Sequence, residues 1–334
     1  MFSYRHAFHA GNHADVLKHL TLVAILKHMT AKESGLTVID THAGAGLYRL
    51  DGDMARTSSE ATQGVHKLFE DTIFKTKRSL PHIESVKSAT KLIAKQAASG
   101  APAKSKPVAQ SAPPAPALQD YLDALATFNK IEGDPHVYPG SPLLIHSLLR
   151  AEVDKLKLFE LHPTDYRNLS GHVTQLKAGR MVTVDCANGF EKLRTLLPPP
   201  NKRALVLMDP SYEMKSDYGV VSACIQEALL KFPTGTFAIW YPIIPRPEAH
   251  SLPKKLKTMA IQAKRSWLQA TLNIGQEPPK HAIGEKPSKL VGLRASGIFI
   301  INPPHTLKAA LNEALPQVVA QLGRGRGKGF SLTS

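Results

Sequence analysis

The chain contains 334 residues, of which 43% are hydrophobic, and its 42 Lys and Arg residues outnumber its 27 Asp and Glu residues to give a formal net charge of +15. This length suits one large α/β domain with an insertion, or two modest domains, and the excess positive charge is compatible with RNA, DNA or anionic lipid as a partner. The two cysteines, Cys186 and Cys224, lie far apart and form no C-x-x-C pair, which argues against a disulfide scaffold or a structural zinc site.

The N-terminal segment lacks the apolar core of an export signal, and no run of about 18 apolar residues occurs along the chain. We therefore expect a cytoplasmic protein. The segment is instead dense in histidine. His9 and His13 would share a helix face near Asp15, which suits a metal site, but Gly11 and Asn12 interrupt the run, and we expect no bound metal.

Seven short segments rich in β-branched or aliphatic residues are predicted to be strands. In chain order they are Leu36–Asp40, Leu156–Leu161, Met181–Asp185, Ala204–Met208, Thr236–Tyr241, Ala270–Ile274 and Gly297–Ile301. Near-continuous apolar runs such as ALVLM at 204–208 are typical of strands covered by helices on both faces. The sequence therefore predicts a doubly wound, mostly parallel sheet whose ligands bind beyond the carboxyl ends of its strands.

The segments between and after these strands predict the domain organisation. Residues 1–51 and 136–316 would form the sheet-containing domain, and residues 52–135 would form a helical insertion, because Val65–Phe74 and Leu118–Phe128 carry helical spacing. Inside the insertion, residues 97–117 are rich in Ala and Pro and offer no apolar face, which predicts a flexible loop. Residues 317–334 are basic and glycine-rich, which is typical of a disordered tail that can contact phosphates, although an idle tail is the simpler interpretation.

A glycine-containing loop, Asp40-Thr41-His42-Ala43-Gly44-Ala45-Gly46, follows the first predicted strand. Glycines in this position allow the backbone to approach a ligand closely. The full G-x-G-x-x-G spacing is missing and Asp40 ends the strand, which disfavours a pyrophosphate and suits a cationic methionine group. A tight strand-to-helix turn without a ligand is the alternative interpretation.

The second and third predicted strands also end in polar residues. Glu160 is placed to accept hydrogen bonds from ribose hydroxyls, although the insertion delays this strand and the match depends on order rather than spacing. Asn188 and Gly189 follow the third strand and suit a turn, and the Asn188 amide is able to read an adenine edge.

The fourth predicted strand runs into Asp209-Pro210-Ser211-Tyr212, which resembles the D-P-P-Y motif of amino-methyltransferases. An adenine amine is a poor nucleophile because its lone pair is delocalised into the ring. The Asp209 carboxylate and the Pro210 carbonyl are able to hold its two N–H groups while a methyl sulfonium approaches in line, and Tyr212 offers a ring for stacking an extruded base. A strand-ending Asp-Pro turn is the alternative.

Together these blocks resemble the RlmJ family, which methylates the N6 of one adenine in bacterial 23S ribosomal RNA. The blocks that carry the resemblance are Tyr4–His6, Phe8–His19, Asp40–Gly46, Tyr138–Pro142, Glu160–Pro163 and Asp209–Glu213, in this order. They extend the resemblance over nearly the whole chain.

The resemblance implies a Rossmann-like class I methyltransferase dependent on S-adenosylmethionine, with a small helical insertion and an N-terminal segment that closes over the cofactor. It implies cofactor contacts, direct or nearby, for His19, His42, Gly44, Ser141, Glu160, Asn188, Gly189 and Asp209. It implies active-site roles for Tyr4 and Lys18, beside Asp209, Pro210 and Tyr212. Two positions differ from the family pattern: Ser211 replaces a second proline and Asn188 replaces an aspartate.

The expected function is therefore methylation of adenine N6 in 23S ribosomal RNA by a monomer that acts on protein-free or early-assembly RNA, without a membrane partner. Two alternatives remain at this point. The same base pocket serves a DNA adenine-N6 methyltransferase, because only recognition of the 2′-hydroxyl separates the two polymers. A basic RNA-binding assembly factor that has lost activity is the other, and the changes at Ser211 and Asn188 keep it open.

Overall fold

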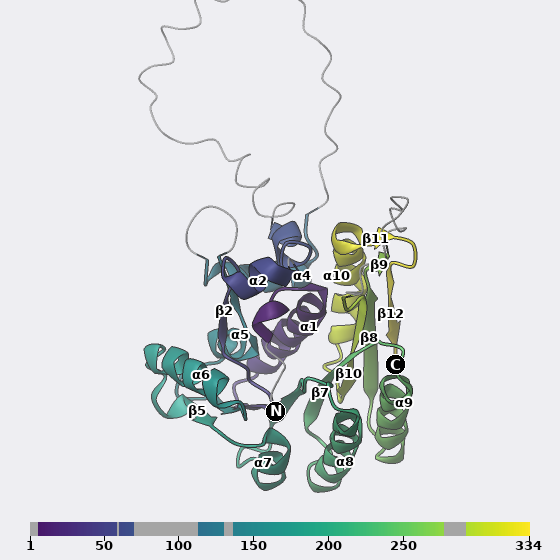
Figure 1. The fold of residues 1–334 in the computed structure, drawn as a ribbon. Helices are drawn as coiled ribbons and strands as arrows, with labels where there is room; N and C mark the ends of the chain where they lie inside the picture. Colours follow the sequence, from purple (N-terminus) through teal and green to yellow (C-terminus); the bar gives the residue numbers. More distant parts are fainter. Residues whose placement is uncertain (1–5, 59, 70–112, 130–135, 277–291) are drawn as a thin grey trace, which may run out of the picture.

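The computed structural model describes residues 6–58, 60–69, 113–129, 136–276 and 292–334 (Figure 1). Its main sheet has eight strands in the order β12-β8-β10-β7-β6-β1-β4-β5. Their bounds are Thr37–Asp40 (β1), Lys155–Phe159 (β4), Val182–Asp185 (β5), Ala204–Met208 (β6), Thr236–Pro242 (β7), Trp267–Asn273 (β8), Ala295–Ile301 (β10) and Gly329–Thr333 (β12). All seven predicted strands are thus present: Ala204–Met208 has the predicted bounds, and the ends of the other strands differ by at most three residues.

The strands are mostly parallel, as expected. β1 pairs in parallel with β4 and β6, β4 with β5, and β6 with β7. β10 is inserted antiparallel between β7 and β8, so that β8 points in the same direction as β1 and β6. The carboxyl ends of β1, β4, β6, β7 and β8 therefore lie at one edge of the sheet.

Helices cover both faces of the sheet and produce three layers (Figure 1). One face carries α1 (His13–Thr30), α4 (Pro116–Ala126), α5 (Ser141–Leu148) and α10 (Leu307–Leu322). The other carries α7 (Gly189–Leu196), α8 (Lys215–Lys231) and α9 (Pro247–Gln262). Side chains alternate between the two cores along each strand, so that Leu207 joins the first core and Val206 the second. Burial on both faces explains the continuous apolar runs in the sequence.

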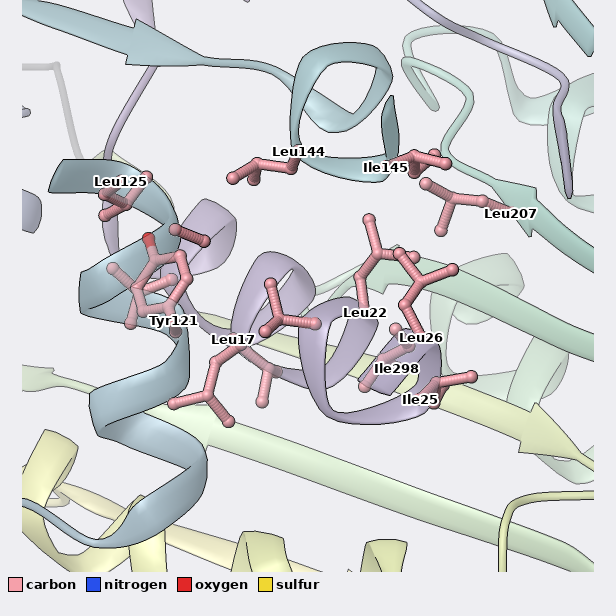
Figure 2. Packing of buried hydrophobic residues seen from close by; sticks show 14 of the residues in the cluster. Leu17, Leu22, Ile25, Leu26, Tyr121, Leu125, Leu144, Ile145, Leu207 and Ile298 are labelled. Carbon is pink, nitrogen blue, oxygen red and sulfur yellow. The ribbon is translucent and has the colours of Figure 1, made fainter. Parts of the chain in front are cut away.

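The central helix α1 is buried over most of its length. Leu22 and Leu26 face the sheet residues Leu207 and Ile298 and the α5 residues Leu144 and Ile145 (Figure 2). The Asn12 side chain caps the helix by accepting hydrogen bonds from the backbone N–H groups of residues 14 and 15 at 2.9 and 3.0 Å. The first turn of α1 is thereby fixed at the carboxyl edge of the sheet. No described helix is both long and apolar enough to span a membrane.

The predicted insertion begins and ends at a small two-stranded sheet. β2 (Leu47–Arg49) pairs antiparallel with β3 (Val137–Pro139), so that the two ends of residues 52–135 lie side by side. Between them the structure describes α2 (Asp53–Ser58), a helical turn at 65–69, and α4, whose Tyr121 and Leu125 pack in the same core as Leu17 (Figure 2). Residues 97–112 of the Ala/Pro-rich stretch lie outside the described residues.

The C-terminal residues differ from the disordered tail that the composition suggested. Residues 317–322 complete α10, residues 324–325 form the short strand β11 (Arg324–Gly325), and β12 adds an eighth, antiparallel strand next to β8. β11 pairs in parallel with β9 (Gly275–Gln276). Phe330 and Leu332 of β12 pack against the first core, which explains why this segment folds onto the sheet despite its glycines.

Candidate active site

The tips of β1 and β6 lie next to each other and open into one cavity. Asp40 pairs with Leu207 in the β1–β6 ladder, and the Thr41 N–H donates to the Leu207 carbonyl at 3.1 Å. Beyond these tips lies a cavity of about 400 Å³, a size suited to a small-molecule ligand. The predicted site residues that line it are Lys18, His19, His42, Gly44, Ser141, Glu160, Asn188, Gly189, Asp209 and Pro210. The motifs that follow the successive strands in the sequence therefore meet in one cavity.

The glycine loop has backbone conformations that explain its composition. Gly44 and Gly46 have φ angles of +65° and +85°, in the left-handed region that favours glycine. The Gly44 N–H donates to Glu160 at 2.8 Å, and the Tyr48 hydroxyl accepts a hydrogen bond from Ala45. A Cβ on Gly189 would overlap the Thr41 carbonyl, so that this glycine allows α7 to begin directly against the loop.

Asp40 lies under the cavity wall and organises it. Its carboxylate is fully buried, accepts a hydrogen bond from the Ser141 hydroxyl at 2.6 Å, and faces the His42 N–H at 3.3 Å. Burial raises the pKa of Asp40 to about 6, although both hydrogen bonds oppose this shift. Asp40 therefore holds Ser141 and His42, which both line the cavity.

Glu160 follows β4 and receives two backbone donors. Its two carboxylate oxygens accept from the N–H groups of Gly44 and His162 at 2.8 and 2.7 Å. Burial raises the pKa of this carboxyl group above its ordinary value despite these bonds. Each oxygen retains a further lone pair directed to other donors, since a carboxylate accepts about four hydrogen bonds.

Two histidines in the cavity wall are kept neutral by burial. His42 lies edge-to-face with Phe190 at 4.6 Å between ring centroids, and burial lowers its pKa to about 4. Burial also lowers the pKa of His19 well below its ordinary range. His19 Nδ1 lies 2.6 Å from the Tyr138 hydroxyl, whereas its Nε2 is buried and makes no hydrogen bond within the described residues. An unpaired buried ring nitrogen at a cavity wall suits a polar ligand atom.

Asn188 is the N-cap of α7. Its side-chain oxygen accepts from the Phe190 N–H at 3.0 Å, and its amide nitrogen donates to Glu191 at 3.0 Å. The predicted turn at residues 188 and 189 is thus a helix start. The Asn188 carbonyl already serves this cap, so that any ligand amine would share its oxygen.

Lys18 connects α1 with the Asp209 motif. Its ammonium lies 2.5 Å from Asp209 Oδ2 and 2.8 Å from Asp15 Oδ1. Burial lowers the pKa of Lys18, but the two carboxylates outweigh this effect and hold it above its ordinary value. Asp15 also accepts from His6 Nε2 at 3.0 Å and from the Gly11 N–H at 2.9 Å. The buried Asp15 is a site residue that sequence reasoning considered only for metal; its position three residues before Lys18 on a helix was the available signal.

A second cavity of about 270 Å³ lies on the other side of this ion pair. His6, Lys18, Asp209, Ser211 and Glu213 line both cavities. The second cavity is completed by His9, Asn12, Ala14, Asp15, Tyr212, Trp240, Pro242, Ile244, Arg246 and Leu293. The Asp209 carboxylate thus lies where the two cavities meet.

Tyr212 belongs to the wall of the second cavity and not to the first. It is only 2% exposed, its φ is +53°, and its hydroxyl donates to the Trp240 carbonyl at 2.7 Å. Its ring packs against Tyr218 with centroids 4.6 Å apart, and Arg246 donates to its carbonyl at 3.0 Å. Arg246 is a further site residue that sequence reasoning missed, because no motif marks its position. Tyr4, the remaining predicted site residue, lies outside the described residues.

The histidines considered for metal binding have other partners. His9 Nδ1 lies 3.0 Å from Glu60 Oε2, and His13 Nε2 lies 2.7 Å from the Leu293 carbonyl. His9 precedes the helix in which His13 is the first residue, so that the two do not share a helix face.

The sheet order, with β10 antiparallel between β7 and β8, and the cavity beyond β1, β4 and β6 are those of the Rossmann-like class I methyltransferase fold. The family model described as "RsmJ: Ribosomal RNA large subunit methyltransferase D, RlmJ" matches residues 33–91 and 107–331. The chain therefore belongs to the RlmJ family of ribosomal RNA large subunit methyltransferases.

Individual relatives agree with this assignment. The chain is 35% identical over 322 residues to ribosomal RNA large subunit methyltransferase J of Haemophilus influenzae, covering 96% of this chain and 94% of the relative. It is 34% identical over 322 residues to the protein of that name from Escherichia coli, again covering 96% of this chain and 94% of the relative. A crystal structure of a Legionella pneumophila protein is 28% identical, covers 98% of both chains, and superposes with a TM-score of 0.72.

Proposed function

We propose that this protein transfers the methyl group of S-adenosylmethionine to the N6 atom of an adenine in 23S ribosomal RNA. One observation carries the proposal: the Asp209 carboxylate lies where two cavities meet, at the tip of β6 beside the glycine loop. One cavity would hold the cofactor and the other the target base. Membership of the RlmJ family supports the RNA of the large subunit as the substrate.

The first cavity fits S-adenosylmethionine. It has a suitable volume, a buried His19 Nε2 without a partner in the described residues, and the Glu160 carboxylate for ribose hydroxyls. Gly44, Gly189 and Ser141 would provide close backbone approach and a hydroxyl in the same wall. When bound there, the cofactor supplies an electrophilic methyl group on a sulfonium.

The residues at the junction would orient the adenine amine. The Asp209 carboxylate and the Pro210 carbonyl are acceptors for its two N–H groups, which raises electron density on nitrogen and fixes the direction of attack. Lys18 now donates to Asp209 Oδ2 at 2.5 Å. An amine that takes this oxygen would leave Lys18 bound to Asp15, so that the positive charge stays in the site.

The same pair of side chains suits adenine better than guanine. Asp209 is an acceptor and Lys18 a donor at neighbouring positions. Adenine presents an amine donor next to a ring nitrogen acceptor, whereas guanine presents a carbonyl acceptor next to an N–H donor. Cytosine shares the adenine pattern, so that discrimination against it would depend on the shape of the second cavity.

The test is transfer of labelled methyl from S-adenosylmethionine to transcribed, protein-free 23S RNA, with the product nucleoside identified by mass spectrometry. We expect N6-methyladenosine at one position, formed by a monomeric enzyme. Preferred methylation of a DNA of matched sequence would instead favour the DNA alternative. If the protein binds RNA but calorimetry detects no heat when S-adenosylmethionine is titrated into it, the result would favour an inactive assembly factor and contradict the proposal.

A further inference from the structure

The glycine-rich basic segment between α10 and β12 is a folded turn. The Arg324 N–H donates to the Ile274 carbonyl at 2.6 Å, and Gln276 and Arg326 exchange backbone hydrogen bonds of 3.0 and 3.1 Å. Gly275 has a φ of +77°, and a Cβ on it would overlap the Arg324 carbonyl. The glycines therefore allow two backbones to meet, and the turn has a defined place in the fold.

This turn gathers positive charge from two distant parts of the chain. We define the basic turn as Arg294, Arg324, Arg326 and Lys328. Arg326 and Lys328 are exposed, and within the described residues neither forms an ion pair with a carboxylate. Arg294 donates to the side-chain oxygen of Gln276, the residue that bridges to Arg326. Exposed guanidinium and ammonium groups that do not pair with a carboxylate are suited to phosphate oxygens.

The basic turn adjoins Leu293, a residue that lines the second cavity. It is attached immediately after β8, whose carboxyl end lies at the same edge of the sheet as the tips of β1 and β6, and Figure 1 shows β9 and β11 side by side next to α10. Leu293 lines the second cavity, precedes Arg294, and accepts a hydrogen bond from His13 at the start of α1. Burial lowers the pKa of His13, and the nearby charge of Arg324 lowers it further.

We infer that the basic turn binds the phosphate backbone of the RNA strand next to the base in the second cavity, an inference that rests on the proposed function. A base that enters this cavity must leave its stack, which brings its own backbone to the cavity rim. Cationic side chains at the rim would hold that backbone in register without reading its sequence. The positive charge of the segment thus has a local role at the site.

The test compares two matched double variants of the full chain. Arg326→Gln/Lys328→Gln removes two charges from the basic turn. Arg180→Gln/Lys202→Gln removes the same two residue types from exposed positions before β5 and β6, at the opposite edge of the sheet. Binding of a labelled RNA of mixed sequence is measured by fluorescence anisotropy at several salt concentrations, and S-adenosylmethionine binding by calorimetry confirms that both variants are folded.

Loss of two phosphate contacts should reduce the slope of log affinity against log salt by about 1.4 to 1.8. We expect this reduction in the basic-turn variant and the wild-type slope in the control variant. A wild-type slope in the basic-turn variant, or an equal reduction in the control, would overturn the inference. Methyl transfer by the wild-type protein is measured in parallel. If the basic-turn variant shows the reduced slope but the wild-type protein transfers no methyl group, the proposed function is wrong and the inferred phosphate site is still supported.

Discussion

Replacing Lys18 with methionine should destabilise the protein strongly, because Lys18 neutralises two carboxylates. Its side chain is 5% exposed, and those of Asp15 and Asp209 are 2% and 16% exposed. Lys18→Met keeps the length of the side chain and removes the ammonium. Among the described residues, the buried Asp15 then keeps His6 and the Gly11 N–H as partners.

The expected cost follows from the burial of this cluster. Removing one partner of a buried ion pair costs about 3–5 kcal/mol, because a desolvated charge remains unpaired. Lys27 is the matched control on the same helix: it pairs with Asp120 at 2.7 Å, but its side chain is 51% exposed. Lys27→Met should therefore cost less than about 1 kcal/mol.

The free energy of unfolding in urea measures both variants across a range of pH. In the wild-type protein, the pKa of Asp15 lies well below its ordinary value because His6 and Lys18 outweigh its burial. Without Lys18 this pKa rises, so that folding takes up a proton and the deficit of Lys18→Met shrinks as pH falls. Equal stability of Lys18→Met and wild type, or a deficit independent of pH between about 5 and 8, would refute this reasoning.

Three further predictions concern the cavity wall. Gly189→Ala should abolish S-adenosylmethionine binding in calorimetry, because the new Cβ overlaps the Thr41 carbonyl. The control Gly171→Ala lies at an open position in α6 (Pro163–Gln175) and should bind the cofactor normally while gaining up to about 1 kcal/mol of stability. Normal cofactor binding by Gly189→Ala would contradict this account. Asp40 has a folded pKa of about 6 against about 3.9 unfolded, so its ionisation should cost the wild type about 2 kcal/mol of stability as pH rises from 4 to 7. Asp40→Asn should show no such loss in urea unfolding. Ser211→Pro should retain methyl transfer, since within the part of the chain that the structure describes the Ser211 hydroxyl accepts a single, long hydrogen bond of 3.5 Å from the Glu213 N–H. A large loss of rate would show instead that this hydroxyl serves the reaction.

Much of the fold was predictable because its strands are buried on both faces. The runs at Ala204–Met208 and Gly297–Ile301 contain no polar residue, and the structure places both in the centre of the sheet. β12 was not predictable in the same way. Its five residues, GFSLT, follow a glycine-rich basic stretch, and only pairing with β8 and packing against the core make them a strand.

The site was predictable where a polar residue or a glycine follows a strand and has a clear chemical role at the carboxyl end of that strand. Asp209, Glu160 and the glycine loop each follow a strand, and the parallel order brings them to one cavity. Roles that depend on long-range packing were not predictable. The Tyr212 ring is buried against Tyr218, and Asp15 acquires its importance because α1 places Lys18 against Asp209.

The most direct test of the account is the rate of methyl transfer to protein-free 23S RNA by Asp209→Ala in a single turnover. Asp185→Ala is the control, because Asp185 is an exposed carboxylate at the tip of β5 that lines neither cavity. Lys18 keeps Asp15 as a partner in the first variant, so that the fold should persist. We expect Asp209→Ala to be at least about 100-fold slower and Asp185→Ala to match the wild type. A wild-type rate for Asp209→Ala, with both variants binding S-adenosylmethionine normally, would contradict the central claim that this carboxylate orients the amine.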